Sequence, residues 1–240
     1  MDREGMRWRR LAGWLALGCL GAVCAWGEGP AGRTPVLLIG DSMMKLPGLA
    51  MERELARLPG VEAHAFAGIG TGLARLDAFD WMGKIDELCA AHHPQVAVVA
   101  LGANDRQPML LPGSVGVVQP GTAEWDAEYG RRIGLAMDRL RAGGCEQVIW
   151  LLLPPMRDPA VSEFAQRING FIAAQAASRP FVKAHDFSKL VVDRRTGGYT
   201  ERMTDPQTAA TIRIREGDGI HLSPDGSRIL ATALIAEYWK

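Results

Sequence analysis

Four polar side chains of this 240-residue chain could together carry out acyl transfer. The tripeptide Gly40-Asp41-Ser42 directly follows an apolar run, so the Ser42 hydroxyl is a candidate nucleophile and its own N–H a candidate oxyanion donor. Asp218 lies three residues before His221, a spacing at which a carboxylate can orient the imidazole as a base. Asn104 follows another apolar run and offers a neutral donor for the same oxyanion.

Each of these signals also has a simpler interpretation. Asp41 or Ser42 could merely cap a helix, and Asn104 could belong to an ordinary turn. His221 could be a solvated surface residue, and His185, which precedes an aspartate, is the best rival base. The catalytic interpretation therefore depends on whether the fold brings these residues together.

Apolar runs of strand length alternate with helical patterns along the chain from residue 36 onward. The predicted strands are Val36–Ile39, Val61–Phe66, Val96–Leu101, Val148–Leu153 and Phe181–His185. The predicted helices cover residues 46–58, 81–91, 123–142, 160–177 and 223–238. Strands that are apolar on both faces and separated by helices predict a three-layer α/β/α sandwich with a five-stranded, mainly parallel sheet. Its carboxyl edge, where ligands bind in such folds, would collect the four candidate residues.

Two stretches and one pair of cysteines do not fit this alternation. Residues 106–122 are expected to form a small hairpin, and residues 187–217 a long polar excursion. Cys89 and Cys145 each precede a predicted strand, so they lie near the same sheet edge. A disulfide and two buried free thiols both remain open for this pair.

The N-terminus has the features of an export signal. Three arginines (Arg7, Arg9 and Arg10) precede an uncharged run from Leu11 to Gly27. We expect residues 1–27 to be a signal peptide or an inner-membrane anchor, 28–35 a linker, and 36–240 the domain. The protein would then be periplasmic or anchored to the inner membrane.

The composition excludes several classes of function. Basic and acidic residues balance at 27 each, so no net positive field attracts nucleic acid. No His, Cys, Asp or Glu cluster has the spacing of a metal site. The Gly68–Gly72 loop lacks the Lys-Ser/Thr of a phosphate-binding loop. We therefore expect neither metal nor cofactor, and membrane contact only through the N-terminal segment.

In combination, these motifs resemble the SGNH (GDSL-type) hydrolase superfamily. Its four blocks correspond here to Gly40-Asp41-Ser42, the Gly68–Gly72 loop, Gly102-x-Asn104-Asp105 and Asp218-x-x-His221. The resemblance implies a flavodoxin-like fold with Ser42 as nucleophile, His221 as base and Asp218 as its orienting carboxylate. The implied oxyanion hole consists of Ser42, Gly72 and Asn104. Gly70 is the second candidate for the oxyanion glycine. The asparagine that usually precedes this glycine is missing here, so the motif alone distinguishes Gly72 from Gly70 less sharply.

Further motifs resemble one exported bacterial branch of this superfamily, formerly of unknown function. They are Thr71–Arg75, Phe79–Trp81, Leu153–Arg157 and Arg215-x-x-Asp218-Gly219-Ile220-His221. The resemblance implies a serine esterase that acts on an acylated glycan or other small ester, with an O-acetyl group of cell-envelope polysaccharide or peptidoglycan as the expected substrate. An O-acyltransferase with the same acyl-enzyme, and a non-catalytic glycan-binding protein, are the alternatives.

Additional residues are candidates for substrate contact: Asp41, Gly70, Asp105 and Arg157. Arg157 could hold an anionic or sugar group, or could simply be an exposed loop residue. Trp81 and Trp125 could stack on sugar rings, although packing beneath a loop is the favoured interpretation for both.

Overall fold

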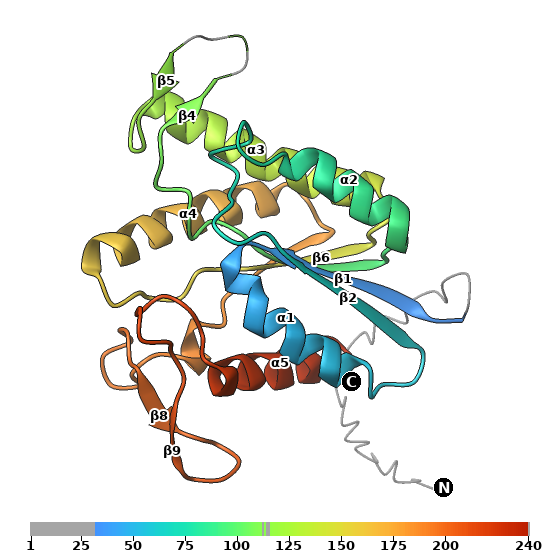
Figure 1. Cartoon of the computed structure of the whole chain (residues 1–240), viewed down its shortest axis with the longest axis vertical. Coiled ribbons are helices and arrows are strands. Elements are labelled where there is room, and N and C mark those ends of the chain that lie inside the picture. The colour runs from blue at the N-terminus through green and yellow to red at the C-terminus, as the bar shows by residue number, and fades with distance from the viewer. Residues whose placement is uncertain (1–31, 112, 114–115, 240) are drawn as a thin grey trace, which may run out of the picture.

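A computed structural model describes residues 32–111, 113 and 116–239. Its centre is a sheet of five parallel strands in the order β2-β1-β3-β6-β7 (Figure 1). The strands are β1 (Thr34–Gly40), β2 (Val61–Ala67), β3 (Val96–Ala100), β6 (Gln147–Leu151) and β7 (Val182–His185). The predicted fold class is therefore confirmed, including the strand order of the flavodoxin-like arrangement.

Helices cover both faces of this sheet and complete the three layers. Helices α1 (Ser42–Leu55) and α5 (Pro224–Tyr238) pack together on one face. The other face carries α2 (Trp81–His92), α3 (Ala123–Ala142) and α4 (Pro159–Ala177), each packed against the next (Figure 1). Because α1 begins at Ser42 and not at the predicted residue 46, the candidate nucleophile belongs to the helix itself.

Burial follows the position of each strand in the sheet. Every residue of β3 is buried, as are the last five residues of β1, whereas the edge strand β2 is partly exposed. The indole N–H of Trp81 donates to Thr71 Oγ1, and that of Trp125 donates to the carbonyl of Gln107. Both tryptophans are fully buried, so they pack beneath loops and do not form a sugar-stacking surface.

The stretches outside the alternation have structure of their own. Strands β4 (Met109–Leu110) and β5 (Val117–Val118) pair antiparallel, which confirms the hairpin predicted within residues 106–122. The polar excursion contains a 3-10 helix, η1 (Ser188–Leu190), and a hairpin of β8 (Arg202–Thr204) and β9 (Thr211–Arg213). This second hairpin projects from the end of the molecule nearest α5 (Figure 1).

The first strand of the domain begins slightly earlier than predicted. Strand β1 begins at Thr34, two residues inside the predicted linker, and pairs there with Val61 of β2. The expected signal or anchor at residues 1–27, and linker residues 28–31, lie outside the described residues. No helix in the described part of the chain is long and apolar enough to cross a membrane.

Cys89 and Cys145 lie together beneath the surface. Both are buried free thiols in this structure, and they are hydrogen-bonded to each other. This hydrogen bond and burial raise the pKa of Cys145. The predicted proximity of the two cysteines is therefore present, with the pair in its reduced form.

Candidate active site

The strand order reverses between β1 and β3, and the candidate site forms at that point. After β1 the chain forms β2 on one side, then crosses to form β3 on the other. Ligands in open α/β sheets bind beyond the carboxyl ends of strands at such a reversal. The two strand ends approach so closely that a Cβ on Gly40 would lie 2.1 Å from the carbonyl oxygen of Ala100. Only glycine fits there, which explains its position before Asp41.

Ser42, His221 and Asp218 form one hydrogen-bonded chain. The Nε2 atom of His221 lies 2.7 Å from Ser42 Oγ, and its Nδ1 lies 2.6 Å from Asp218 Oδ2. Ser42 and His221 are half-buried, whereas Asp218 is more exposed. Partial burial opposes ionisation of Asp218, but hydrogen bonds from His221 and from the backbone of Ile220 hold its pKa below the usual value. An ionised Asp218 fixes the proton on Nδ1 and leaves Nε2 to accept the serine proton.

A buried arginine holds the loop that carries Asp218 and His221. Arg215 is completely buried, and its guanidinium donates to the carbonyls of Ile220 and Pro155. Burial lowers its pKa to about 10, although the charges of Tyr199 and Asp218 oppose this shift. The loop closes through the bond from the N–H of Glu216 to the carbonyl of His221. Arg215 thus joins the catalytic loop to the segment that follows β6.

Arg157 supports the same loop from the other side. Its backbone N–H donates to the carbonyl of Gly219 and its Nη2 to that of Gly217. Gly219 has φ +78°, and a Cβ there would lie 2.5 Å from Arg157 Cβ. Arg157 therefore positions the loop in this structure, and its contact with a substrate stays a prediction, because the side chain is exposed.

Asp41 is a buried organiser of the site. Its Oδ1 accepts from the N–H of Met43, which caps α1, and its Oδ2 accepts from Gly102 and Ala103 after β3. Burial raises the pKa of Asp41 to about 7, against the opposing effect of these backbone hydrogen bonds. With no exposed surface, Asp41 cannot touch a substrate as predicted. It ties the nucleophile turn to the asparagine turn.

The three predicted oxyanion donors follow the carboxyl ends of β1, β2 and β3, which are neighbours in the sheet. The N–H of Ser42 lies at the start of α1, where helix geometry leaves it without an intrahelical partner. One N–H of the Asn104 amide donates to the carbonyl of Thr71 at 2.9 Å, which joins the asparagine to the glycine loop. A Cβ on Gly72 would lie 2.1 Å from Asp105 Oδ1, so this position requires glycine. Gly70, by contrast, is exposed, with φ +73° and open space around it.

A buried carboxylate, Asp105, supports the glycine loop. Asp105 is buried and accepts hydrogen bonds from the N–H of Ala74 at 2.7 Å and the hydroxyl of Tyr129 at 2.6 Å. Burial raises the pKa of Asp105, although the Tyr129 hydroxyl opposes this. Its predicted contact with substrate is excluded in this structure by the same burial. Asp105 acts instead as the support for Gly72.

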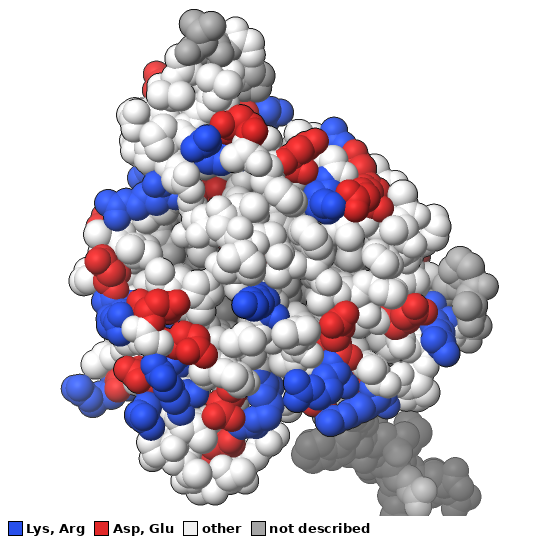
Figure 2. Space-filling view, viewed as in Figure 1, with Lys and Arg blue, Asp and Glu red and all other residues white. Residues whose placement is uncertain are grey.

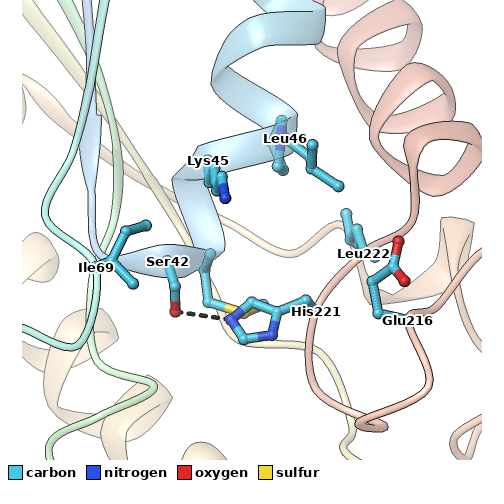
Figure 3. Close-up of a pocket in the computed structure, with 9 residues that line it drawn as sticks. Ser42, Lys45, Leu46, Ile69, Glu216, His221 and Leu222 are labelled. Atoms are coloured by element: carbon cyan, nitrogen blue, oxygen red, sulfur yellow. Dashed lines mark hydrogen bonds between the residues drawn. The ribbon is translucent and has the colours of Figure 1, made fainter.

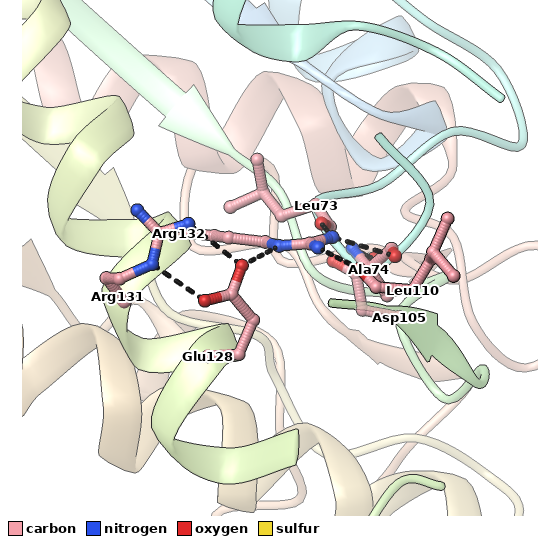
Figure 4. Close-up of polar contacts among 7 residues, drawn as sticks. All are labelled: Leu73, Ala74, Asp105, Leu110, Glu128, Arg131 and Arg132. Atoms are coloured by element: carbon pink, nitrogen blue, oxygen red, sulfur yellow. Dashed lines mark hydrogen bonds and ion pairs between the residues drawn. The ribbon is translucent and has the colours of Figure 1, made fainter. Parts of the chain in front are cut away.

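Arg132 of α3 gives the loop a second support (Figure 4). Its Nη1 donates to the carbonyls of Leu73 and Ala74, and its Nη2 to that of Leu110 in β4. Glu128 accepts from Arg132 Nε at 2.7 Å and keeps the buried guanidinium paired. The network therefore fixes the glycine loop and the hairpin to one helix.

A cleft opens beside Ser42 and His221 (Figure 3). Its volume is about 320 Å³, and its walls are mainly apolar. Besides the two catalytic candidates it is lined by Met43, Lys45, Leu46, Pro47, Ile69, Glu216 and Leu222. No group of three metal-binding side chains occurs among the residues that the structure describes.

The structure separates the four candidate residues from their rival. His185 lies at the end of β7, and its Nδ1 bonds to Tyr238 Oη at 3.0 Å, away from Ser42. Sequence reasoning missed the supporting roles of Arg132 and Arg215. Arg215 stood within a recognised motif, but nothing in the sequence distinguishes an arginine that binds backbone carbonyls from an exposed one.

Fold and sequence blocks together define a member of the SGNH (GDSL-type) hydrolase superfamily. A family model described as "Protein of unknown function (DUF459)" matches residues 35–237, so the chain belongs to the DUF459 family. No curated protein shows significant sequence similarity to it.

Three solved structures of similar fold are distant from this chain in sequence. A GDSL-like lipase from Bacteroides thetaiotaomicron is 14% identical with a TM-score of 0.56, over 89% of this chain and 92% of that one. A family 3 carbohydrate esterase from Clostridium thermocellum is 15% identical with a TM-score of 0.52, over 85% and 94%. A variant of an acetyl-xylooligosaccharide esterase from Geobacillus is 14% identical with a TM-score of 0.54, over 87% and 96%. These similarities establish the fold.

Proposed function

We propose that this protein is a serine ester hydrolase that acts through an acyl-serine intermediate. The observation that carries the proposal is the unbroken hydrogen-bonded chain from Ser42 Oγ through His221 to Asp218. A capping serine or a solvated histidine needs no such chain. Acyl transfer by a Ser-His-Asp triad uses all three groups in this order.

In this mechanism His221 Nε2 removes the hydroxyl proton as Ser42 Oγ attacks the ester carbonyl carbon. The tetrahedral intermediate collapses when His221 returns that proton to the leaving alcohol oxygen, which leaves an acyl-serine. Water then attacks the acyl-serine, again with His221 as base, and releases the carboxylic acid and free Ser42. Asp218 keeps the imidazole oriented and stabilises its charged form throughout.

The oxyanion of each tetrahedral intermediate would be held by the N–H groups of Ser42 and Gly72 and by the Asn104 amide. The support of Gly72 by Asp105 and Arg132 favours this role, because donors fixed before the reaction need no reorganisation as charge develops. Removal of one such donor typically costs about 10²–10³ in kcat.

The proposed substrate is an O-acetyl ester of cell-envelope polysaccharide or peptidoglycan. Two observations support this choice: the fold is shared with a carbohydrate esterase and an acetyl-xylooligosaccharide esterase, and the arginines before Leu11 suit an export signal. We accordingly propose that the enzyme works in the periplasm or at the inner membrane.

Replacement of Ser42 by alanine tests the proposal. Wild-type protein should release 4-nitrophenol from 4-nitrophenyl acetate, and Ser42→Ala should lower kcat by roughly 10⁴-fold or more. A fluorophosphonate probe should label the wild type on Ser42 and leave the variant unlabelled. An unchanged rate in Ser42→Ala would contradict the mechanism.

The same assay separates the alternatives. Addition of an oligosaccharide acceptor would reveal acyl transfer if the acetyl group moves to sugar in preference to water. Wild-type protein that binds polysaccharide, yet has no Ser42-dependent turnover and no labelling, would instead be a glycan-binding protein.

A further inference from the structure

Lys45 is the feature of the cleft that the esterase mechanism leaves unexplained. It lies in α1 three residues after Ser42, so the two side chains share one face of the helix. It is exposed, and it has no hydrogen bond or ion pair within the described parts of the chain. Figure 3 places it on the wall of the cleft above Ser42. Its ammonium group is therefore available to a ligand.

The position of Lys45 in the helix is unfavourable for the fold. A cation in the first turn opposes the helix dipole, and the first turn of α1 contains no acidic residue to compensate. The cap residue Asp41 is buried beneath the turn and engaged with backbone N–H groups. A residue that opposes the local helix preference, and that gains no stabilising contact in exchange, is expected at a functional site.

The surroundings of Lys45 define the chemistry of its ligand. Lys45 is the one lysine or arginine among the described residues that line the cleft, and Leu46, Pro47 and Ile69 make the neighbouring wall apolar. Ile69 is 60% exposed, which is unusual for so large an apolar side chain. Figure 2 shows a mainly uncharged area around the N-terminal end of α1, with charged residues gathered at its margins. An apolar surface beside one cation suits a ring that carries a negative group.

Glu216 adds a second, opposite charge. It comes from the loop that carries His221, lines the cleft across from α1, and forms no ion pair with Lys45 (Figure 3). A ligand anion is therefore attracted toward α1 and repelled from the His221 loop. The two charges together orient an anionic ligand in one direction.

The contact of the cleft with His221 favours the leaving-group side of the reaction. His221 forms part of its wall, whereas Gly72 and Asn104 do not. The oxygen of the leaving alcohol must reach His221 Nε2 to receive its proton, and the oxyanion must point toward Gly72 and Asn104. The contact with His221 is therefore the reason for placing the alcohol portion of the ester in this cleft.

We infer that the cleft selects esters whose alcohol carries a carboxylate, such as an acetylated acidic sugar, and that Lys45 is the residue that determines this specificity. The inference rests on the proposed esterase function and adds the substrate class. The acyl group would lie on the other side of Ser42, so Lys45 and Glu216 do not select for its charge.

Three aryl acetates of matched shape provide the test. The anionic ester is 3-acetoxybenzoate, the neutral one 3-acetoxybenzamide and the cationic one 3-acetoxy-N,N,N-trimethylanilinium. We expect the wild type to prefer the anionic over the neutral ester in kcat/KM. Lys45→Gln should reduce that ratio about five- to tenfold, mainly through KM, and Lys45→Glu should shift the preference to the cationic ester. Rising salt should weaken the wild-type preference.

Controls separate this effect from other consequences of the substitution. Lys183→Gln removes an exposed lysine on the distant strand β7 and should leave the ratio unchanged. Lys45→Gln should not lower Tm, because the lysine opposes the helix dipole. Glu216→Gln should raise the preference for the anionic ester.

Several results would overturn the inference. Equal wild-type rates on the three esters, or an unchanged ratio in Lys45→Gln, would refute a role for Lys45 while leaving the esterase intact. Lys45-dependent preference for a carboxylate in the acyl chain, measured with 4-nitrophenyl hemiglutarate against 4-nitrophenyl butyrate, would refute the alcohol-side placement. Failure of the wild type on every ester, with no fluorophosphonate labelling, would instead refute the esterase proposal.

Discussion

At the scale of single residues, Asp218 is the group that acts indirectly in the proposed mechanism. It touches only the imidazole and the backbone of its own loop. Asp218→Asn should retain the size of the side chain but present an N–H or a neutral oxygen to His221 Nδ1. This favours the tautomer with the proton on Nε2, which cannot accept the serine proton. We expect kcat on 4-nitrophenyl acetate to fall about 10³–10⁴-fold with little change in Tm.

Asp186→Asn is the matched control for this prediction. Asp186 is exposed and follows the rival base His185, where it accepts only from the N–H of Ser188. Its replacement should leave kcat within about twofold, since surface substitutions away from special contacts have small effects. Equal loss in both variants would mean that Asp218 has no specific role.

Capping and catalysis were competing interpretations of Gly40-Asp41-Ser42 in the sequence, and the structure is compatible with both, because it contains the cap and the Ser42–His221 hydrogen bond. Asp41 caps α1, and because it does so, Ser42 falls at the first helical residue with its N–H unpaired. The residue types and their order could be predicted. That Asp41 also reaches Gly102 could not, since this contact joins residues 61 positions apart.

At the scale of elements, the proposed mechanism requires the glycine loop to hold the oxyanion. Gly72→Ala would force a Cβ into the Asp105 carboxylate, 2.1 Å away, and so displace the loop. We expect kcat/KM on 4-nitrophenyl acetate to fall by at least about 10²-fold, the typical cost of one lost oxyanion donor. KM should change less than kcat, because the lost contact forms in the transition state.

Gly70→Ala provides the comparison within the same loop. Its positive φ makes alanine unfavourable by about 1 kcal/mol, but a Cβ there meets no neighbour. Tm should therefore drop while kcat stays close to the wild-type value. A larger loss of kcat in Gly70→Ala than in Gly72→Ala would reassign the oxyanion donor to Gly70.

The elements themselves followed from apolar runs and helical spacing, and the hairpin within residues 106–122 from its turn residues. The side chains that support the loops could not be predicted from such patterns. Arg132 and Arg215 bind backbone carbonyls, and carbonyls are offered by every residue, so no complementary side chain marks their partners. The preference for Gly72 over Gly70 likewise came from resemblance, and the close approach of Asp105 now gives it a physical reason.

At the scale of the whole molecule, the parallel sheet determines that residues far apart in sequence share one edge. Burial of β1 and β3 on both faces is visible in their continuous apolar runs, so the fold class could be predicted. The cleft could not, because residues 42–47, 69 and 216–222 form it only after α1 and the last loop meet. This is why the proposed chemistry could be predicted from the sequence, whereas the proposed charge of the substrate required the structure.

Burial of two carboxyl groups beneath the site makes the stability of the whole domain depend on pH. The unfolded chain releases the Asp41 proton near pH 4, whereas the folded protein keeps it until about pH 7. Between these values the folded state binds more protons, so this group lowers the free energy of unfolding as pH rises, by about 1.4 kcal/mol for each unit of pKa shift. Asp105, whose pKa is also raised, acts in the same direction.

Asp41→Asn isolates this contribution, because asparagine carries no titrating proton. Urea unfolding at several pH values from 4.5 to 8 should show the variant less stable than wild type by the largest margin at low pH. The margin should shrink by a few kcal/mol as pH approaches 8, where the wild type bears the full cost of a buried charge. Asp158→Asn, which alters the exposed cap of α4, accounts for the loss of a capping carboxylate alone. A margin for Asp41→Asn that stays constant with pH would show that Asp41 is ionised in the folded protein throughout this range, with its three backbone N–H donors outweighing its burial.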